Sequence, residues 1–216
     1  KRNGRDRRRT ALRVKHMSQQ SAAVIVAAGL SSRMGRFKPL LVLNGKPMIR
    51  HVIDTLRAHG VAQLVVVTGN NADVLEAALC GCGAQFVRNE RYAQTQMFDS
   101  ARLGLQCVHA SCHDIFFTPA DVPLFPPTVL ERLSKTEGDF VCPTFHGQEG
   151  HPVLLRKSAV NRLLTDCGDG GLRCAVERQH IHKVCIEVTE CGILFDADTP
   201  ADFERIKRLS GEESLQ

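Results

Sequence analysis

The chain has 216 residues, of which 43% are hydrophobic and 24% are charged, so it can form a globular domain with a full core rather than a disordered chain. No apolar run reaches the roughly 20 residues that a membrane-spanning helix needs, and we therefore expect a cytoplasmic protein with no membrane partner. The net charge of +5 comes from the Lys and Arg side chains that crowd residues 1–16, and the remainder of the chain is slightly acidic, so no nucleic-acid partner is expected.

Short apolar runs alternate with amphipathic segments from Val24 onward. Because strands that alternate with helices usually form a parallel sheet, we predict one α/β domain with helices on both faces. A tight turn is expected at Asn44-Gly45. The expected strands are 24–28, 64–67, 84–87, 114–118, 139–143, 151–155 and 183–188. The expected helices are 48–59, 72–79, 97–109, 127–133, 158–164 (capped by Ser158), 172–179 and 199–209 (capped by Thr199).

The domain is expected to cover residues 22–210, between a basic arm at 1–21 and a flexible tail at 211–216. Met17 is a plausible start, which would make the basic arm upstream sequence. The nine cysteines are odd in number and form no CxxC pair, so we expect reduced thiols that act mostly as small apolar side chains. Cys80-Gly-Cys82 is a weaker metal candidate, because it lacks a second pair of ligands.

The most informative segment follows the first expected strand. Val24–Ala28 is an apolar run that breaks at Gly29 into a loop of small residues, which also carries Arg33 and Lys38. Small side chains allow backbone N–H groups to approach a polyphosphate, and the two cations can neutralise its charge. The loop therefore indicates a nucleotide site, although its spacing matches neither GxxxxGK[ST] nor GxGxxG.

Residues 24–38 resemble the LxAGxSxRMGxxK signature of the MobA-like nucleotidyltransferases, and the resemblance covers most of residues 22–209. It implies a Rossmann-like, mostly parallel sheet of the nucleotide-diphospho-sugar transferase type. It also implies that Arg33 and Lys38 are catalytic, offsetting charge on the leaving pyrophosphate and the α-phosphate. The alternative is an ordinary strand–loop–helix turn with surface cations. The implied nucleotide contacts are Ala27, Ala28, Gly29, Leu30, Ser31, Arg33, Lys38, Thr68, Gly69, Asn89 and Ser100.

A carboxylate at the end of the 114–118 strand is the expected metal ligand. Asp121 lies in a loop stiffened by Pro119 and Pro123, and Mg²⁺ prefers one or two carboxylates plus water and phosphate oxygens. The family resemblance gives Asp121 a catalytic, Mg²⁺-binding role. The segment after Phe195 resembles the family's (N/D)x(N/D)TPxD pattern and supplies Asp198 as a second ligand, with Asp196 as the other candidate. Alternatively, Asp121 caps its own turn and Asp198 favours the dipole of the following helix.

Nucleotide selectivity is expected where strand ends meet the base. The Ala27-Ala28-Gly29 sequence resembles cytidylyl-transferring members of the family, whereas guanylyl-transferring members tend to read Leu-Ala-Gly-Gly, so the resemblance favours CTP. One segment departs from the family pattern. Residues 94–100 keep Ser100 but lack the usual glycine, and Gln96 or Asp99 is a candidate to replace the backbone contact with a side chain.

Two further segments resemble the acceptor side of molybdopterin cytidylyltransferases. Residues 147–152 match their GxxGHP pattern, and residues 169–173 are similar to their GDxGxR loop. The resemblance implies that His151 contacts the acceptor phosphate or pterin and that Arg173 holds an anionic acceptor. A structural histidine and a plain surface arginine are the alternatives.

Together these resemblances imply Mg²⁺-dependent transfer of CMP from CTP to the phosphate of molybdopterin, with release of pyrophosphate. A molybdoenzyme that receives the product is a further expected partner. Two other functions stay open. One is a sugar- or alditol-phosphate nucleotidyltransferase, and the other is a non-catalytic nucleotide-binding assembly factor for a molybdoenzyme.

Overall fold

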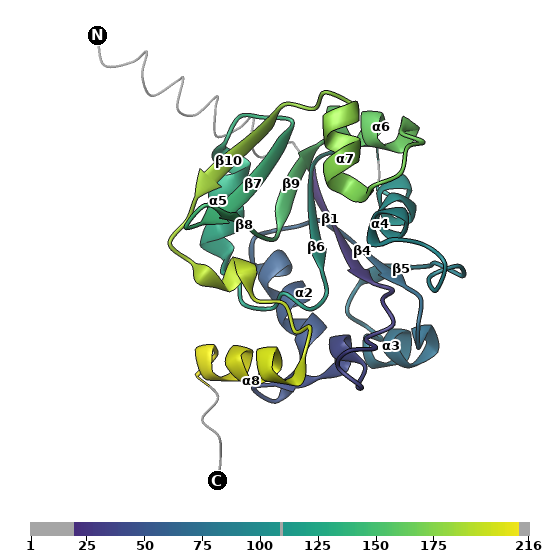
Figure 1. Ribbon diagram of the computed structural model, residues 1–216, viewed down its shortest axis with the longest axis vertical. Helices are drawn as coiled ribbons and strands as arrows, with labels where there is room; N and C mark the ends of the chain where they lie inside the picture. Colours follow the sequence, from purple (N-terminus) through teal and green to yellow (C-terminus); the bar gives the residue numbers. More distant parts are fainter. Residues whose placement is uncertain (1–19, 109, 212–216) are drawn as a thin grey trace.

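The computed structural model describes residues 20–108 and 110–211, and it has a central sheet covered by helices (Figure 1). The strand order is β10-β7-β9-β6-β1-β4-β5, and the short β8 pairs with β7. The strands are β1 (Gln20–Ala27), β4 (Gln63–Thr68), β5 (Ala84–Arg88), β6 (Cys112–Pro119), β7 (Phe140–Phe145), β8 (Gln148–Glu149), β9 (Val153–Arg156) and β10 (Lys183–Glu187). A separate hairpin joins β2 (Val42–Leu43) to β3 (Lys46–Pro47).

The sheet is mostly parallel, as the alternation of strands and helices predicted. β1 lies between β4 and β6, parallel to both, and β5 and β10 also run parallel to their neighbours. The short β8 pairs antiparallel with β7, and β9 pairs antiparallel with both β6 and β7. This insertion brings the segment just before β9 to the carboxyl end of β6, where ligands bind in open α/β sheets.

Seven α-helices of the described residues pack against this sheet or the hairpin. They are α2 (Met48–Ala58), α3 (Ala72–Ala78), α4 (Met97–Gln106), α5 (Pro127–Lys135), α6 (Lys157–Thr165), α7 (Gly171–Arg178) and α8 (Pro200–Leu209). Alternation along β1 separates two core layers, since Val24 packs toward α4, α6 and α7, while Ile25 packs toward α2, α3 and α5. The α4 helix lies close to the sheet at Gly104, where an added Cβ would come within 2.5 Å of Val24.

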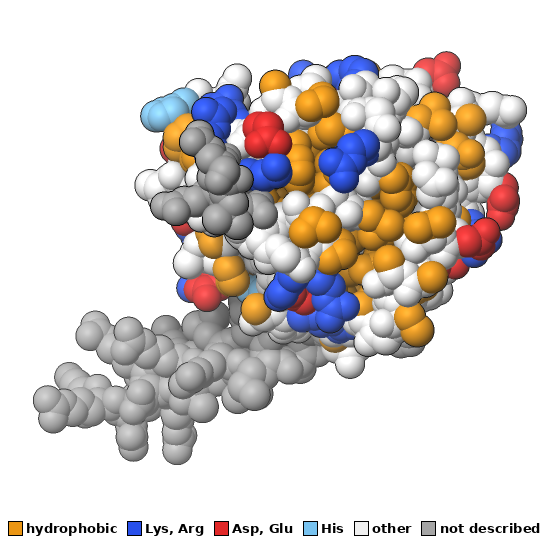
Figure 2. All heavy atoms as spheres, turned by 90° about the horizontal axis from the view of Figure 1, so that it is seen from below, with side chains coloured by type: hydrophobic (Ala, Val, Ile, Leu, Met, Phe, Trp, Pro, Cys, Tyr) orange, Lys and Arg blue, Asp and Glu red, His pale blue; other side chains and the backbone are white. Residues whose placement is uncertain are grey.

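A third apolar cluster joins α8 to the β2–β3 hairpin. Phe203 and Ile206 of α8 pack with Met34, Leu43 and Met48. In Figure 2, which views the molecule from below, apolar side chains form a band across the middle of the face, with Lys and Arg side chains gathered beside it. The cluster fixes the segment before α8 against the loop after β1, and this contact assembles the site described below.

Most element predictions are confirmed within a few residues, including the turn at Asn44-Gly45 and the cap of α8 by Thr199. Two are wrong. The α4 helix ends at Gln106 rather than continuing to 109, and α6 begins at Lys157, so Ser158 is not its cap but donates a hydrogen bond to Asp139. The sequence reading also missed β8 and the 3₁₀ helices η1 (Lys38–Leu40) and η2 (Cys191–Leu194).

The structure describes only part of the segments on which the expected domain limits depend, and it describes all of the cysteines. The β1 strand starts at residue 20, so the last two residues of the expected basic arm belong to the sheet. Residues 1–19 and 212–216, with Met17 and nearly all of the predicted arm and tail, lie outside the described residues. All nine cysteines are free thiols, but only Cys112 and Cys142 are buried. The expectation that most of the cysteines act as small apolar side chains is therefore wrong. No helix in the described parts of the chain has the length and apolarity of a membrane span.

Candidate active site

The loop after β1 forms one wall of a pocket of about 290 Å³ at the carboxyl ends of β1 and β6. Ser31 has a left-handed backbone (φ 54°), and its hydroxyl accepts a hydrogen bond from the backbone N–H of Lys38 over 3.3 Å. This contact folds the loop back so that its two ends meet. The predicted residues that line the pocket are Ala27, Ala28, Gly29, Leu30, Ser31, Arg33, Lys38, Ser100, Asp121 and Asp198.

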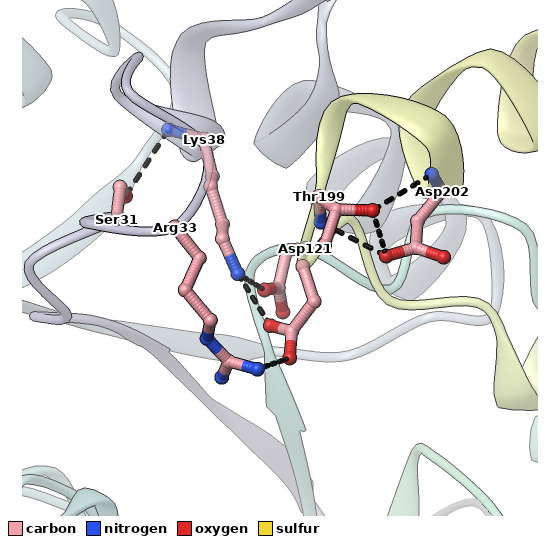
Figure 3. A network of polar contacts seen from close by, with 7 residues as sticks. Ser31, Arg33, Lys38, Asp121, Thr199 and Asp202 are labelled. Carbon is pink, nitrogen blue, oxygen red and sulfur yellow. Dashed lines mark hydrogen bonds and ion pairs between the residues drawn. The ribbon is translucent and has the colours of Figure 1, made fainter.

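The Lys38 ammonium joins the two predicted acidic residues (Figure 3). Its Nζ lies 3.2 Å from Oδ2 of Asp121 and 2.6 Å from Oδ1 of Asp198. Arg33 approaches from the solvent side, and its Nη1 lies 2.8 Å from Oδ2 of Asp198. Only 13% of the Lys38 side chain is exposed, compared with 72% for Arg33, so Lys38 is held inside the pocket while Arg33 remains free to reorient.

Backbone contacts hold the two acidic loops together. The N–H of Ala197 donates to the carbonyl of Asp121 over 3.2 Å, and the N–H of Ala120 donates to the carbonyl of Val26. The helix that follows Asp198 begins with a capping box, in which Thr199 and Asp202 exchange hydrogen bonds. Each carboxylate of the pocket is therefore anchored by the main chain beside it.

The charges in the pocket shift one another's pKa values. Burial lowers the pKa of Lys38, but hydrogen bonds and charges from Asp198 and Asp121 outweigh burial and leave the pKa raised. The hydrogen bond from Lys38 lowers the pKa of Asp198. The pKa of Asp196 is raised, first by burial and then by the charges of Asp198 and Asp121. Lys38 and Asp198 are therefore both charged at neutral pH, whereas burial favours the neutral form of the Asp196 carboxyl.

A family model described as the MobA-like NTP transferase domain matches residues 23–184 of the chain. The chain belongs to this family. It is therefore an enzyme, a nucleotidyltransferase, as the loop after β1 predicted, and the non-catalytic assembly factor loses its support. The sheet topology agrees with the nucleotide-diphospho-sugar transferase fold that the resemblance implied.

Among MobA-like relatives, molybdenum cofactor cytidylyltransferase of Escherichia coli strain K12 is 26% identical over 185 residues, which cover 83% of this chain and 92% of that protein. The bifunctional protein GlmU of Agrobacterium fabrum is 34% identical over 124 residues. That match covers 55% of this chain but only 27% of the GlmU protein. The matched region thus spans about a quarter of that relative's length.

Among solved structures, the protein Rv0371c of Mycobacterium tuberculosis H37Rv superposes with a TM-score of 0.74 and 25% identity, over 88% of this chain and 99% of that one. A second structure of Rv0371c, a complex with manganese, gives a TM-score of 0.72 with 23% identity. That match again covers 88% of this chain and 99% of the other. The fold of the MobA-like domain is therefore reproduced along nearly all of the described chain.

The donor set of the pocket fits a hard cation. Asp121 and Asp198 present one oxygen each to the same point, which the Lys38 ammonium occupies. No group of three or more His, Cys, Asp or Glu side chains suited to a metal occurs among the described residues. Two carboxylates with room for water and phosphate oxygens are the arrangement that Mg²⁺ prefers.

Of the residues predicted to contact base and ribose, only some lie at the pocket. Ser100 lines the pocket, and Asn89 lies behind it, donating from Nδ2 to the hydroxyls of Ser100 and Thr95 over 2.8 Å each. Thr68 and Gly69 do not line it. Thr68 is in register with Ala27 on the face toward α3, and its hydroxyl donates to Glu76. Gly69 allows a close approach, since a Cβ there would lie 2.7 Å from the Cβ of Tyr92.

Sequence reading missed several residues of the pocket wall. Tyr92, Thr95 and Met97 line it together with Gln96, which was considered as a substitute for a backbone contact. The backbone N–H of Gln96 donates to the carboxylate of Asp99, and this bond fixes the start of α4. The signal available in the sequence was the polar connection between β5 and α4, which carries Asn89, Thr95 and Gln96, but it does not show which side chains face inward.

The two predicted acceptor residues lie together in a second pocket. His151 and Arg173 both line a cavity of about 500 Å³ formed by β7, β9, β10 and α7. Arg173 is exposed, and its guanidinium lies 3.7 Å from the carboxylate of Glu149. Burial lowers the pKa of His151, and a hydrogen bond to the backbone of Phe117 and the charge of Asp121 oppose this shift without cancelling it. The structure thus places the residues implied for nucleotide and acceptor in separate but neighbouring pockets.

Proposed function

We propose that this enzyme transfers CMP from CTP to the phosphate of molybdopterin and releases pyrophosphate. The main support is the single cluster that Lys38, Asp121 and Asp198 form beside the loop after β1, since this cluster can serve a triphosphate and a metal together. The Ala27-Ala28-Gly29 sequence supports CTP. The match over 92% of the E. coli cytidylyltransferase supports molybdopterin as the acceptor.

In the proposed reaction an oxygen of the acceptor phosphate attacks the α-phosphorus of CTP. A new P–O bond forms while the bond from the α-phosphorus to the bridging oxygen breaks, and pyrophosphate leaves with the electron pair. The acceptor oxygen is already anionic, so no general base is needed. The obstacle is the repulsion between two anions, which Lys38 and Arg33 reduce by placing positive charge beside the phosphates.

Asp121 and Asp198 would hold Mg²⁺, which when bound neutralises phosphate charge and polarises the reacting phosphoryl group. The manganese complex of Rv0371c supports a divalent cation in this fold. With the cation held by both carboxylates, Lys38 is free to donate to a phosphate oxygen, and the exposed Arg33 side chain can turn from Asp198 to the leaving group. The N–H groups of the loop around Gly29 would bind the terminal phosphates.

A direct test mixes the purified chain with Mg²⁺, each of the four nucleoside triphosphates in turn, and molybdopterin, and measures pyrophosphate release. The proposal expects release with CTP at a rate at least tenfold above that with GTP, ATP or UTP. If GTP is the one nucleotide of the four that gives release with molybdopterin, the cytidylyl assignment is wrong. If none of the four nucleoside triphosphates gives pyrophosphate release with molybdopterin, the acceptor assignment is wrong.

A sugar phosphate is the second candidate acceptor, because the chain has the nucleotide-diphospho-sugar transferase fold. The same assay separates the two, with glucosamine 1-phosphate or another sugar phosphate in place of molybdopterin. If CTP and a sugar phosphate release pyrophosphate while CTP and molybdopterin do not, the sugar-phosphate assignment replaces ours.

A further inference from the structure

The ammonium of Lys38 lies at the point where two carboxylates converge in the pocket beside the loop after β1 (the nucleotide pocket). Its Nζ is 3.2 Å from Oδ2 of Asp121 and 2.6 Å from Oδ1 of Asp198, and Figure 3 shows the side chain extended toward Asp121. A hard divalent cation needs the same carboxylate oxygens. Lys38 and the metal are therefore competitors for one position.

The main chain holds Lys38 in place. Its backbone N–H donates to the hydroxyl of Ser31 over 3.3 Å, and its carbonyl accepts a hydrogen bond from the N–H of Leu41 over 3.0 Å. Pro39, the next residue along the chain, is buried. The ammonium therefore leaves the carboxylates by rotation of the Lys38 side chain and not by movement of the loop.

The two carboxylates are held in a similar way. The N–H of Ala197 donates to the carbonyl of Asp121 over 3.2 Å, and the N–H of Thr199 donates to the carboxylate of Asp202 over 2.9 Å. These bonds fix the backbone on both sides of Asp198. Asp121 and Asp198 therefore share one cation position, which the ammonium and a metal do not occupy together.

The four groups in contact are electrically balanced. Lys38 and Arg33 carry two positive charges, and Asp121 and Asp198 carry two negative charges. A divalent cation that enters alone takes both carboxylates from Lys38 and adds positive charge beside it. Only 13% of the Lys38 side chain is exposed, so water replaces these partners poorly. Binding of the metal alone is therefore unfavourable.

A triphosphate removes this obstacle. The loop around Gly29 forms the wall of the pocket beside Lys38, and phosphates bound to its N–H groups would present anionic oxygens to the ammonium. Lys38 then exchanges carboxylate partners for phosphate partners and stays paired, which frees Asp121 and Asp198 for the metal. By thermodynamic linkage, the metal must strengthen triphosphate binding by the same factor as the triphosphate strengthens metal binding.

We propose that Lys38 competes with the divalent cation for Asp121 and Asp198, so that the cation binds well only together with a nucleoside triphosphate, whose phosphates take over the ammonium. Lys38 thus has a role in controlling metal entry that is separate from its proposed action on the reacting phosphates. This inference rests on the proposed function, because it concerns the same metal and the same triphosphate.

The first test measures metal affinity without nucleotide. Mn²⁺ is titrated into the full chain, and the free ion is followed by electron paramagnetic resonance. Lys38→Met keeps the length of the side chain and removes its charge, and it should bind Mn²⁺ about tenfold more tightly than the wild type, or more. Adding Asp121→Asn to this variant should abolish the gain, because the bound ion would lose one of its two carboxylates.

Two variants serve as matched controls for the loss of charge. Arg33→Gln removes the other cation that pairs with Asp198, but from a side chain that is 72% exposed. Lys46→Met removes a surface lysine that pairs with Asp54. Both should bind Mn²⁺ within about threefold of the wild type, because surface ion pairs contribute little. A cooperative thermal transition of each variant shows that it is folded.

The second test measures CTP affinity with and without Mg²⁺ by calorimetry. The wild type should bind CTP about tenfold more tightly with Mg²⁺, or more, a typical coupling between two ligands. This ratio should fall at least threefold in Lys38→Met, where the cation no longer has to displace an ammonium. Formation of the Mg²⁺–CTP complex in solution affects both proteins equally and cancels in the comparison.

Three results would overturn the inference. They are an unchanged Mn²⁺ affinity of Lys38→Met, a gain in Arg33→Gln as large as that in Lys38→Met, and an equal effect of Mg²⁺ on CTP binding by the wild type and Lys38→Met. The Mn²⁺ titration needs neither acceptor nor nucleotide, so its outcome is separate from the proposed function. Pyrophosphate release by the wild type with an unchanged Mn²⁺ affinity of Lys38→Met would leave the reaction assigned and the competition wrong. A tenfold gain without pyrophosphate release would do the reverse.

Discussion

The two pockets are neighbours, but they are built from the chain in different ways. The pocket beside the loop after β1, which we propose binds the nucleotide, takes about half of its wall from the end of β1 and that loop. The rest comes from the β5–α4 connection, the start of α4, the end of β6 and Asp198. The second pocket takes only Glu149, Gly150 and His151 from one consecutive segment, and its other residues come from β7, β9, β10 and α7. Binding a triphosphate depends on backbone N–H groups and so on consecutive residues, whereas a pocket lined by side chains depends on elements that packing brings together.

The largest effect is expected from Lys38→Ala, which removes the cation shared by both carboxylates. The rate of pyrophosphate release should fall about 100- to 1000-fold, the usual loss for one group that stabilises transition-state charge. Steady-state kinetics with CTP, Mg²⁺ and molybdopterin measure it. Lys46→Ala is the control, because Lys46 pairs only with Asp54 at the surface. A rate within twofold of the wild type would show that the loop does not act on the phosphates.

Asp121→Asn should have the next largest effect, a loss of about 10- to 100-fold, because an amide is a weaker Mg²⁺ ligand than a carboxylate. The concentration of Mg²⁺ that gives half-maximal rate should rise as well. A metal titration of the variant against Asp54→Asn, which alters an exposed carboxylate on α2, measures both changes. An unchanged titration curve would remove Asp121 from the metal site.

Asn89→Ala tests how the wall of the nucleotide pocket is supported. The substitution removes the hydrogen bonds that Asn89 donates to Ser100 and Thr95 and the one that it accepts from the backbone N–H of Arg91. It leaves the buried Ser100 hydroxyl unpaired, which should lower the free energy of unfolding by about 1–2 kcal/mol. The KM for CTP should rise several-fold as Ser100 and Thr95 lose their alignment. Urea unfolding and kinetics report the two effects, with the exposed Asn161→Ala in α6 as the control. Equal stability of both variants would contradict the support role.

Arg173→Gln distinguishes two hypotheses for this residue of the second pocket. In one, Arg173 holds an anionic acceptor directly, and in the other it is a surface arginine that pairs with Glu149. The Arg173 side chain is 74% exposed. If it only pairs with Glu149, the KM for molybdopterin should rise about two- to fivefold, as expected for the loss of a surface ion pair. The KM for CTP should not change. A rise above twentyfold would favour the earlier hypothesis, in which Arg173 holds an anionic acceptor directly.

Asp166→Asn, in the loop that leads into α7, is expected to have the smallest effect on activity at neutral pH. Hydrogen bonds from Arg178 lower the pKa of Asp166 to about 2, from an ordinary value of 3.8. A lowered pKa means that this contact stabilises the fold above pH 3.8 and is lost as the pH falls toward 2. The melting temperatures of the wild type and Asp166→Asn should therefore differ at pH 7 and converge near pH 2. A constant difference over that range would show that the ion pair is not responsible.

Sequence patterns predicted which segments of this protein form strands, helices and loops. They predicted less well which side of the sheet each strand residue faces. The β1 strand, the loop after it and the capped start of α8 depend on neighbouring residues, and all three are confirmed. Thr68 and Gly69 were placed by analogy at the end of a strand. Since alternate residues of a strand face opposite sides, Thr68 points toward Glu76 on α3 instead of into the pocket.

The sequence by itself determined the mostly parallel α/β fold, the family and the position of the small-residue loop after β1, for which we propose phosphate binding. Each of these follows from short-range periodicity or from a run of consecutive residues. Only the tertiary structure decided that Lys38 meets Asp121 and Asp198, which lie 83 and 160 positions away. The same holds for the second pocket, which forms only when the antiparallel β9 joins the sheet and α7 packs over it. Contacts between distant residues depend on how whole layers pack, and no local pattern records that.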